Sequence, residues 1–581
     1  MRLIKIGAFL EREEVMRQKG KLDRRIKVLE FRDDETTKYA ILSHRWIDPT
    51  EVDYEEIVDL VKMNRQERDE IRGRLGYKKI LETCELAKKD GYEWVWVDTC
   101  CIDKRSSAEL SEAINSMYRW YANSRVCYAY LHDVHGSFPA KHDDEKYPKS
   151  NGLPEWFSRG WTLQEMIAPS NVQFFNKDWQ AIGDKKKLVQ TLKILTKVPE
   201  HILTDGLSGN RPCVAQIMSW AAERTTTRVE DRAYSLMGLL DVNMPMLYGE
   251  GKKAFHRLQL EVIRMSNDQS IFVWAGFPIN NARIGSILAD DPSSFGWCSD
   301  MELMEHDEFI GCLKHDIPVK ELSSIKQDHF GTFSITNRGI KIRMLLRPYP
   351  DSNTVFQAYL PCHVKSGAPV SIDLALWNSN YYLYPQEFFS HPQNPLPLPL
   401  QFCQVYLRYQ DTCPDVTFKV DDSAVIEKGY SSKLTEDTLT LTGANPFCVR
   451  TYSNEQCNSR FAVVFGQFLG WDWVHWIDDP PSDPFRFEML ALKGIDRAQS
   501  MAYLPCRDGT HSRRMWVHHG RLPGSWIVRT YRAVWERSKI QVRVEVFHDP
   551  DFHNDLEEWK SFDIEVSAFL DLRMDYSHEN L

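Results

Sequence analysis

A carboxylate with suitable surroundings for catalysis stands in the segment SRGWTLQEM (158–166). If this segment is helical, Ser158, Trp161 and Glu165 follow one another at i, i+3 and i+7 and share one face. An indole beside a carboxylate displaces water from it, which raises its pKa and can hold its proton for use in a reaction. A solvated acid on an amphipathic helix is the ordinary alternative, and the spacing alone does not decide between the two.

A second candidate group is the tetrapeptide Ser43, His44, Arg45 and Trp46. The guanidinium of Arg45 can donate two parallel hydrogen bonds to a phosphate, and the indole of Trp46 can stack on a base. The alternative for Arg45 is an ordinary surface ion pair. The segment is therefore a candidate binding site for a nucleotide.

The third candidate group is DTCCIDK (98–104). Asp98 could accept a hydrogen bond from a ribose hydroxyl or pair with Arg45, and the alternative is that Asp98 and Asp103 only cap or form salt bridges. The next residues, Cys100 and Cys101, raise the question of a thiol nucleophile.

A thiol nucleophile would need a base, which His132 or His44 could supply. Buried cysteines more often serve as small apolar fillers, so the sequence favours a structural role for both thiols.

The elements that would position these groups alternate between strands and helices over the first 200 residues. Short apolar or aromatic runs predict strands at 39–43, 94–98, 126–131 and 172–175. Helical periodicity predicts helices over about 66–90 and over 156–168. A further helix is predicted to begin at a capping box formed by Ser106 and Glu109. This alternation predicts an α/β domain with a doubly wound parallel sheet, in which ligands bind beyond the carboxyl ends of the strands. The three candidate groups lie after such strands.

The chain beyond residue 200 changes character twice. Residues 201–275 read as a helical extension, in which Leu258, Val262 and Met265 fall on one side of a helix. From residue 276 apolar residues alternate with period two, as at Ile340, which predicts a β-rich region. We therefore expect three regions: an α/β domain (1–200), its helical extension (201–275) and a β-rich C-terminal region (276–581) of unknown role.

Composition excludes several classes of function. The formal charge of -10 comes from interspersed acids and bases, which argues against a nucleic-acid binder. The 13 cysteines form no C-x-x-C pair, so we expect no metal site and a reducing, cytoplasmic compartment. The sequence contains no run of about 18 apolar residues, so we expect no membrane span. P-loop, G-x-G-x-x-G, G-x-S-x-G and H-E-x-x-H motifs are also missing from the sequence.

Several long motifs in this order resemble the fungal heterokaryon-incompatibility (HET) domain: YAILSHRW, YEWVWVDTCCIDK, SSAELSEAINSMYRWYANSRVCYAYLHDV and WFSRGWTLQEMIAP. The segment 224–263 is similar to the stretch that commonly follows this domain. The resemblance covers about residues 30–275, and the later region resembles the tails of such proteins only loosely. It implies a role in fungal non-self recognition and regulated cell death.

HET domains are in turn similar to TIR domains, which implies a flavodoxin-like sheet. Enzymatic TIR domains carry their catalytic glutamate in a pattern S-x-W-x-x-x-E-L. Here Ser158, Trp161 and Glu165 resemble that pattern, with one additional residue between Ser and Trp and with Met166 in place of Leu. The additional residue affects the alignment of Ser158 more than that of Glu165.

The resemblance implies an NAD+ nucleosidase, with NAD+ as substrate and no further cofactor. Cleavage of the nicotinamide–ribose bond passes through an oxocarbenium-like state, which the carboxylate of Glu165 would stabilise. Nicotinamide leaves as a neutral molecule, so one carboxylate is sufficient. Arg45 would hold the pyrophosphate, Asp98 a ribose hydroxyl, and Trp46 or Trp161 would stack on a ring.

Two hypotheses follow for the whole chain. In the first, the TIR-like module cleaves NAD+ after self-association through the HET domain, in response to an unknown protein trigger. In the second, the module is a non-catalytic scaffold that docks on copies of itself, while the β-rich region senses a partner. The first predicts that Arg45, Asp98 and Glu165 line one open cleft, whereas a Glu165 that is enclosed or points to bulk solvent favours the second.

Overall fold

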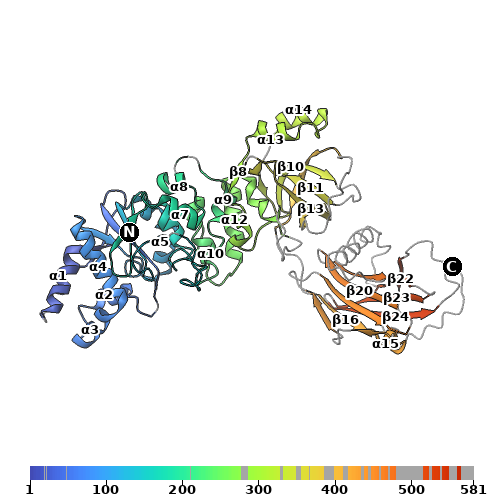
Figure 1. The fold of residues 1–581 in the computed structure, drawn as a ribbon, viewed down its shortest axis with the longest axis horizontal. Coiled ribbons are helices and arrows are strands. Elements are labelled where there is room, and N and C mark those ends of the chain that lie inside the picture. Colours follow the sequence, from blue (N-terminus) through green and yellow to red (C-terminus); the bar gives the residue numbers. More distant parts are fainter. Residues whose placement is uncertain are drawn as a thin grey trace. The chain divides into compact units, whose positions relative to one another are not determined.

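The computed structural model describes most of the chain. The described residues are 1–276 without 19, 21, 48, 140, 208 and 210, then 286–327, 332–348, 355–384 without 366 and 378, 398–409, 416–432, 438–441, 447–468 without 457 and 458, and the strands at 471–478, 514–522, 526–536, 539–548 and 559–563. They form two compact units (Figure 1). The N-terminal unit contains Met1–Trp274, Leu288–Cys312 and Leu360–Val370, and the C-terminal unit contains Ala275–Ile287, Leu313–Tyr359 and Ser371–Leu581.

The N-terminal unit is built on a seven-stranded sheet of order β2-β1-β4-β3-β5-β6-β7. Its strands are β1 (Arg2–Lys5), β2 (Leu29–Phe31), β3 (Tyr39–His44), β4 (Trp94–Trp96), β5 (Val126–Tyr130), β6 (Val172–Phe175) and β7 (Ala181–Asp184). The sequence prediction of strands at the positions of β3, β4, β5 and β6 is confirmed, and these four strands run parallel. Antiparallel strands flank them at both edges, so the sheet as a whole is mixed rather than purely parallel.

Strand β3 lies at the centre of this unit and is buried along its whole length. The apolar run that predicts it is what a strand covered on both faces requires. Its last two residues, Ser43 and His44, pair in register with Ala129 and Tyr130 of β5. The candidate residues from position 43 onward therefore lie at the carboxyl end of the parallel strands.

The following helices belong to the first 200 residues: α1 (Ile6–Arg17), α2 (Tyr54–Asp59), α3 (Arg65–Gly73), α4 (Leu75–Lys89), α5 (Ser107–Asn123), α6 (Thr162–Ile167) and α7 (Val189–Thr196). The single helix predicted over about 66–90 is wrong, because the chain is extended at Arg74 and forms α3 and α4 instead. Gly76 explains the break: its N–H donates to Thr50 O, and a Cβ there would stand 2.5 Å from that oxygen. The loop that carries Thr50 thus contacts the start of α4, a position that a continuous helix over 66–90 would block.

The predicted helix over 156–168 is also too long, because only α6 is helical. The backbone before it pairs with a distant segment: Thr225 N donates to Ser158 O at 2.6 Å, and Gly160 N donates to Thr225 O at 2.9 Å. Backbone groups used in this way cannot also form helical hydrogen bonds. Ser158 therefore does not share a helical face with Glu165.

The capping box predicted for α5 forms only in part. Ser106 Oγ accepts from the backbone N–H of Glu109 at 3.3 Å, as predicted. The carboxylate of Glu109 does not return to Ser106. It pairs with Arg2 at 2.6 Å and accepts from the N–H of Asp103 at 3.0 Å.

Residues 201–276 are mainly helical, as predicted, and those up to Trp274 belong to the same compact unit as the sheet. The elements are α8 (Glu200–Asp205), α9 (Val214–Ser219), α10 (Asp231–Tyr234), α11 (Met237–Leu240), α12 (Lys253–Met265) and the 3-10 helix η1 (Gln269–Gly276). On α12 the residues Leu258 and Val262 are buried, but Met265 is exposed because the helix ends there. The division between an α/β domain and a helical extension at residue 200 stays a prediction.

Later segments of the chain complete the N-terminal unit. They carry η2 (Pro292–Phe295), β8 (Met301–Leu303), most of α13 (His306–Leu313) and β12 (Cys362–Val364). Strands β8 and β12 pair antiparallel.

The β-rich character predicted for the C-terminal region is confirmed in the described part. One sheet has the order β11-β13-β14-β15-β10-β9 and closes on itself, since β10 also pairs with β11. Its elements are α14 (Val319–Gln327), β9 (Ser334–Ile335), β10 (Ile340–Pro348), β11 (Val355–Tyr359), β13 (Ser371–Trp377), β14 (Asn380–Tyr384) and β15 (Gln401–Leu407). The alternating residues Ile340, Ile342 and Met344 are buried on β10, as their spacing predicts.

Two further sheets pack on one another in the same unit, with orders β18-β16-β24-β23-β22-β25 and β17-β19-β20-β21. Their elements are β16 (Val416–Asp421), α15 (Ser423–Glu427), β17 (Ser431–Ser432), β18 (Thr438–Leu441), β19 (Phe447–Asn454), β20 (Ser459–Phe468), β21 (Trp471–Asp478), β22 (Arg514–Leu522), β23 (Trp526–Glu536), β24 (Lys539–His548) and β25 (Trp559–Asp563). Phe418 of the first sheet and Phe465 of the second belong to one buried apolar cluster, their ring centroids 5.7 Å apart.

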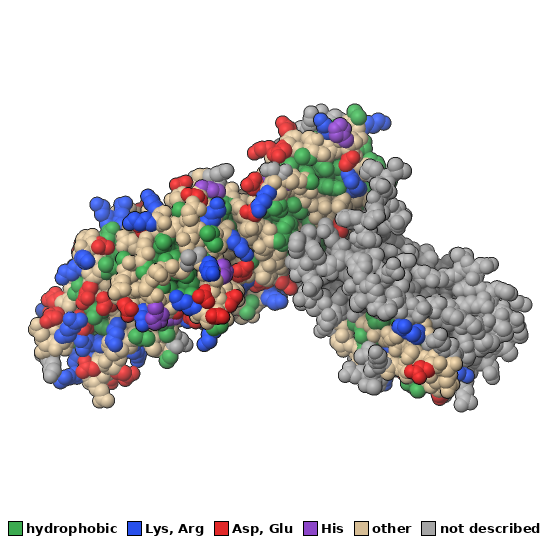
Figure 2. Space-filling model, in the orientation of Figure 1, with side chains coloured by type: hydrophobic (Ala, Val, Ile, Leu, Met, Phe, Trp, Pro, Cys, Tyr) green, Lys and Arg blue, Asp and Glu red, His purple; other side chains and the backbone are tan. Residues whose placement is uncertain are grey.

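The surface of the N-terminal unit carries both signs of charge. Figure 2 shows acidic and basic side chains interspersed over its visible face. Within the described part of the chain, no helix has the length and apolar character needed to cross a bilayer.

Candidate functional site

Glu165 is a buried carboxylate at the centre of the N-terminal unit, only 4% exposed on α6. Ser43 Oγ donates to its Oε2 at 2.5 Å, and the same hydroxyl accepts from Trp156 Nε1 at 2.8 Å. The hydroxyl of Tyr121, which donates to Leu42 O at 3.2 Å, lies near enough to lower the pKa of the carboxyl. Ser43 of β3 therefore holds the carboxyl, and Trp156, from the segment before α6, holds Ser43.

The surroundings of Glu165 favour its protonated form. Burial is the largest cause, and the nearby charge of Asp98 is the second; together they raise the pKa of Glu165 from 4.5 to about 8. The hydrogen bonds from Ser43 and Tyr121 and the charge of Arg159 act in the opposite direction without cancelling this rise. A carboxyl in this state carries a proton at neutral pH and can lose it when a cation approaches.

Asp98 connects this carboxyl with the tetrapeptide at the end of β3. Trp46 Nε1 donates to Asp98 Oδ2 at 2.7 Å. His44 is buried with Nδ1 3.8 Å from Asp98 Oδ1 and Nε2 3.6 Å from Glu51 Oε2. Strand ends β3 and β4 thus bring together residues that the sequence predicts as one binding site.

Trp46 is 43% exposed, but one side of its ring is already occupied. The ammonium of Lys104 lies 3.7 Å from the ring centroid, as in a cation–π contact. The predicted stacking on a base therefore has to use the other face or displace Lys104. The sequence did not single out Lys104.

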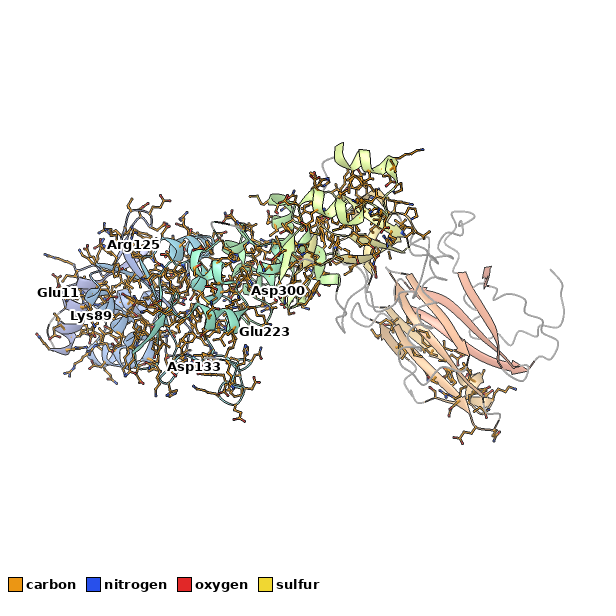
Figure 3. All side chains as sticks on the ribbon, turned by 45° about the horizontal axis from the view of Figure 1, so that its top comes forward. Glu11, Lys89, Arg125, Asp133, Glu223 and Asp300 are labelled. Carbon is orange, nitrogen blue, oxygen red and sulfur yellow. The ribbon has the colours of Figure 1, made fainter. Side chains whose placement is uncertain are left out.

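Arg45 forms the ion pair that the sequence left open as its ordinary role. Its Nη1 pairs with Glu155 Oε2, and His132 Nε2 lies 3.4 Å from the same oxygen. Glu155 is fixed in turn, because its N–H donates to Asp133 Oδ2 at 2.8 Å. Asp133 is labelled in Figure 3. Arg45 must leave Glu155, or share it, to reach a phosphate.

Trp161 and Ser158 do not share a helical face as predicted, because α6 begins after both residues. The indole of Trp161 lies near enough to Asp231 to lower the pKa of that carboxyl, and Asp231 accepts from Tyr248 at 3.0 Å. The indole joined to Glu165, through Ser43, is that of Trp156. Sequence reasoning missed Trp156 because the helix predicted over 156–168 gave it no distinct position.

The thiols after β4 are not placed to act as nucleophiles. Cys100 and Cys101 are both buried. A hydrogen bond with Cys101 and burial raise the pKa of the Cys100 thiol well above its ordinary value, which opposes formation of a thiolate. Among the described residues no group of three or more His, Cys, Asp or Glu side chains is arranged to hold a metal ion.

Two arginines that the sequence analysis did not select contribute to the site. Arg159 contributes a favourable charge to Glu165, and its Nη1 donates to Thr227 Oγ1 at 3.1 Å. Arg224 is buried and donates from Nη1 to Arg159 O at 2.8 Å and to Thr162 Oγ1 at 3.0 Å. It thereby fixes the turn that leads into α6.

The site as a whole is closed. Asp98 and Glu165 are coupled at the carboxyl end of the parallel strands, and the tetrapeptide 43–46 lies there too. The predicted open cleft is wrong for this conformation, because Glu165 is enclosed and Arg45 is engaged in an ion pair. A substrate reaches Glu165 only after the surrounding side chains move.

Comparison with known proteins identifies part of the N-terminal unit. The family described as "Heterokaryon incompatibility protein (HET)" matches residues 39–153. The vegetative incompatibility protein HET-E-1 of Podospora anserina is 43% identical over 226 residues, which cover 39% of this chain and 16% of that protein. The chain thus spans about a sixth of the length of this relative.

Among solved structures, the wild-type lectin XCL of Xerocomus chrysenteron and a mutated form of it align with 23% of this chain. The alignments cover 98% and 99% of the lectin chains at 12% and 11% identity, with TM-scores of 0.17 and 0.18. Likenesses at this level support no argument about fold or function.

Proposed function

We propose that the chain acts in vegetative incompatibility, the fungal recognition of non-self, because residues 39–153 match the heterokaryon incompatibility family. The support is the name of the relative HET-E-1 and the 43% identity to it. A regulated cell-death outcome is part of the same proposal. The β-rich C-terminal unit would then sense the partner that triggers the response.

We further propose that the domain is TIR-like. Its four parallel strands follow the order β4-β3-β5-β6, which is 2-1-3-4 when these strands alone are numbered along the chain. A flavodoxin-like sheet begins with the same order. The strands β1, β2 and β7, which join the sheet through antiparallel pairings, are additions to that core.

The proposed reaction is cleavage of the nicotinamide–ribose bond of NAD+, and the observation that carries it is the buried Glu165. A carboxyl with a pKa near 8, beside a second carboxylate at the ligand-binding end of a parallel sheet, fits a catalytic group better than a structural one. The nicotinamide ring of NAD+ is cationic, so its approach would favour loss of the proton from Glu165. The resulting carboxylate would then stabilise the positive charge that develops on the ribose.

The remaining residues would bind the substrate. Arg45, once released from Glu155, would hold the pyrophosphate, and Asp98 would accept from a ribose hydroxyl. The free face of Trp46 would stack on a ring. Because Glu165 is enclosed in the single chain, we propose that self-association through the HET domain opens the site.

A second function is favoured by one specific observation, namely the closed state of the site. Glu165 is 4% exposed and Arg45 is paired. If this state persists in the assembled protein, the sheet serves as a docking module and Glu165 only stabilises the fold. The two functions predict different effects of the same substitution.

The test is to incubate the purified chain with NAD+ and to follow nicotinamide release at protein concentrations that promote self-association. Glu165→Gln keeps the shape of the side chain but cannot supply a carboxylate. The matched control is Glu112→Gln, which makes the same change at an exposed position on α5. We expect release by the wild type and by Glu112→Gln, and a loss of at least about a hundredfold in Glu165→Gln, the range found for removal of one electrostatic catalytic group. Equal rates in wild type and Glu165→Gln, or no release by any form when self-associated, would leave the docking function.

A further inference from the structure

An open groove of about 610 Å³ lies between the helices α1 and α4 of the N-terminal unit. Figure 1 shows these two helices next to one another at one end of the unit. The half-buried side chains of Leu10 and Leu81 form the apolar part of the groove. Its charged lining includes Glu11, Glu14, Arg17, Glu85, Lys88 and Lys89. The groove shares no lining residue with the candidate site around Glu165.

The charges of the groove are distributed unequally between the two helices. Glu11 and Glu14 are three residues apart on α1, so they are neighbours on the surface of that helix. Lys88 and Lys89 occupy the last turn of α4. All four side chains are exposed, and Figure 3 labels Glu11 and Lys89 at the same end of the unit. Two carboxylates therefore stand on one wall of the groove and two ammonium groups on the other.

None of these four charges forms an ion pair within the part of the chain that the structure describes. Glu14 accepts one hydrogen bond, from the neutral side chain of Gln18 at 2.6 Å. The other two charges of the lining compensate one another, since Arg17 Nη2 lies 4.0 Å from Glu85 Oε1. The groove thus presents two acids and two bases that a single copy of the chain leaves unpaired.

Gly7 is a second feature of the groove that the fold of one chain does not explain. It is exposed in the first turn of α1 and lines the groove. Glycine is a poor helix former, and here a Cβ would meet no atom within 4 Å, so packing inside the chain does not require it. The missing side chain leaves room for another molecule to approach the backbone of α1 closely.

We propose that this groove is the surface through which two copies of the chain associate, with α1 of each copy lying against α4 of the other. A two-fold dimer uses the same patch of both copies, so each contact occurs twice. Glu11 and Glu14 then face Lys88 and Lys89 of the second copy, which supplies the opposite charges that one copy leaves unpaired. The proposal rests on the self-association proposed above, but not on NAD+ cleavage.

Helix α4 connects this surface with the candidate site. Lys79 of α4 is buried, and its Nζ lies 2.5 Å from Glu51 Oε1. The other oxygen of Glu51 lies 3.6 Å from His44 Nε2, at the end of β3. A second copy seated on α4 therefore contacts the helix that holds Glu51 beside the tetrapeptide 43–46. This gives self-association a route by which it can change the closed site.

The first test is sedimentation velocity of the full chain without NAD+, over a range of protein concentrations. Exposed ion pairs are individually weak and are screened by salt, so the dimer should weaken as ionic strength rises. We expect the dissociation constant to increase at least about tenfold between about 50 mM and about 500 mM sodium chloride.

The second test exchanges the charges of the two walls. Glu11→Lys combined with Glu14→Lys makes both walls basic, and Lys88→Glu combined with Lys89→Glu makes both walls acidic. Like charges then face one another in each homodimer, so each double variant should associate at least about tenfold more weakly than the wild type. An equimolar mixture of the two double variants should associate again, because every contact between them joins unlike charges.

Two controls separate association from folding. Lys186→Glu combined with Lys193→Glu reverses two exposed charges outside the groove and should leave the dissociation constant unchanged. Gly7→Gln adds a neutral side chain where one chain has room for a Cβ. It should therefore keep or raise the melting temperature while it weakens association, a combination that a purely structural role of Gly7 does not produce.

The proposal is overturned if the wild type stays monomeric at about 100 µM protein in the lower salt concentration. It is also overturned if the double variants associate like the wild type, or if their mixture associates no better than either alone. An association that these variants leave unchanged would place the interface elsewhere without touching the NAD+ proposal. Conversely, a dimer that behaves as expected but releases no nicotinamide would refute NAD+ cleavage and leave this surface in place.

Discussion

The protonation of Glu165 in the folded protein leads to a prediction that can be worked out in full. The pKa of its carboxyl is about 8 in the folded chain, mainly because of burial, against an ordinary value of 4.5. Between these two values the folded chain binds a proton that the unfolded chain has lost. The contribution of this proton to the free energy of unfolding is fully present below pH 4.5 and is lost as the pH rises through 8.

The magnitude follows from the size of the shift. Each unit of pKa difference corresponds to about 1.4 kcal/mol, so the full loss between pH 4.5 and 8 is on the order of 5 kcal/mol. Glu165→Gln replaces the carboxyl by a neutral group of the same shape and removes this dependence. We therefore expect the variant to equal the wild type in stability below pH 4.5 and to be more stable at pH 8.5.

The assay is hydrogen exchange of the backbone amides of α6 and β3, measured in both proteins at each pH. Comparing wild type and variant at the same pH cancels the intrinsic exchange rate and the titration of all other groups, and it reports local opening in a chain with two units. The free-energy difference should change by about 1.4 kcal/mol per pH unit between pH 5.5 and 7.5. Asp98→Asn removes the second cause of the shift, so the same change should begin at the same pH, end at a lower pH and be smaller in total. A difference between wild type and Glu165→Gln that stays constant over this range would refute the reasoning, because it would mean that Glu165 is already ionised when folded.

Three further predictions concern the scaffold. Lys185 is buried, and its Nζ donates to the carbonyl oxygens at the end of α6, so Lys185→Met should destabilise the N-terminal unit by about 2–4 kcal/mol in thermal unfolding and lower the protection of α6. Gly76→Ala would place a Cβ 2.5 Å from Thr50 O, so we expect a loss of about 1–3 kcal/mol, seen as a lower melting temperature, whereas Gly73→Ala has open space and should be neutral. Arg450→Met leaves Asp422 buried without its 3.0 Å ion pair, and should destabilise the C-terminal unit by about 3 kcal/mol while hydrogen exchange in α6 stays unchanged.

The sequence predicts the parallel core of the N-terminal unit because that core is encoded locally. Strands such as β3 are short continuous apolar runs, as a strand buried on both faces requires. The carboxyl ends of these strands then bring Ser43 and Asp98 to one side without further information. The buried positions of β10 follow from period two in the same way.

The features that the sequence does not predict depend on contacts between distant segments. The helix before Glu165 is shorter than its periodicity predicts because Ser158 and Gly160 pair with Thr225, which nothing in the local sequence marks. The same pairing determines which indole serves the site. Trp156 reaches Ser43 because the segment is not helical, whereas Trp161 turns to Asp231.

The closed state of the site is also a non-local property. Burial of Glu165 requires Tyr121 from α5 and Ser43 from β3 to converge on one carboxyl. The spacing of residues within a single helix carries no signal for such convergence. For the same reason, a neighbouring indole suggests a raised pKa for Glu165, but the sequence does not identify burial and Asp98 as its principal causes.

The central claim, that Glu165 acts as the carboxylate that cleaves NAD+, is tested most directly by the pH dependence of nicotinamide release from the self-associated chain. Because the reaction needs the ionised form and burial raises the pKa of Glu165 in the closed chain, the rate at limiting NAD+ should rise between pH 6.5 and 9, and Glu165→Gln should lose at least about a hundredfold of the release at either pH. A rate that Glu165→Gln retains in full, or that is already maximal at pH 6.5, would contradict the account.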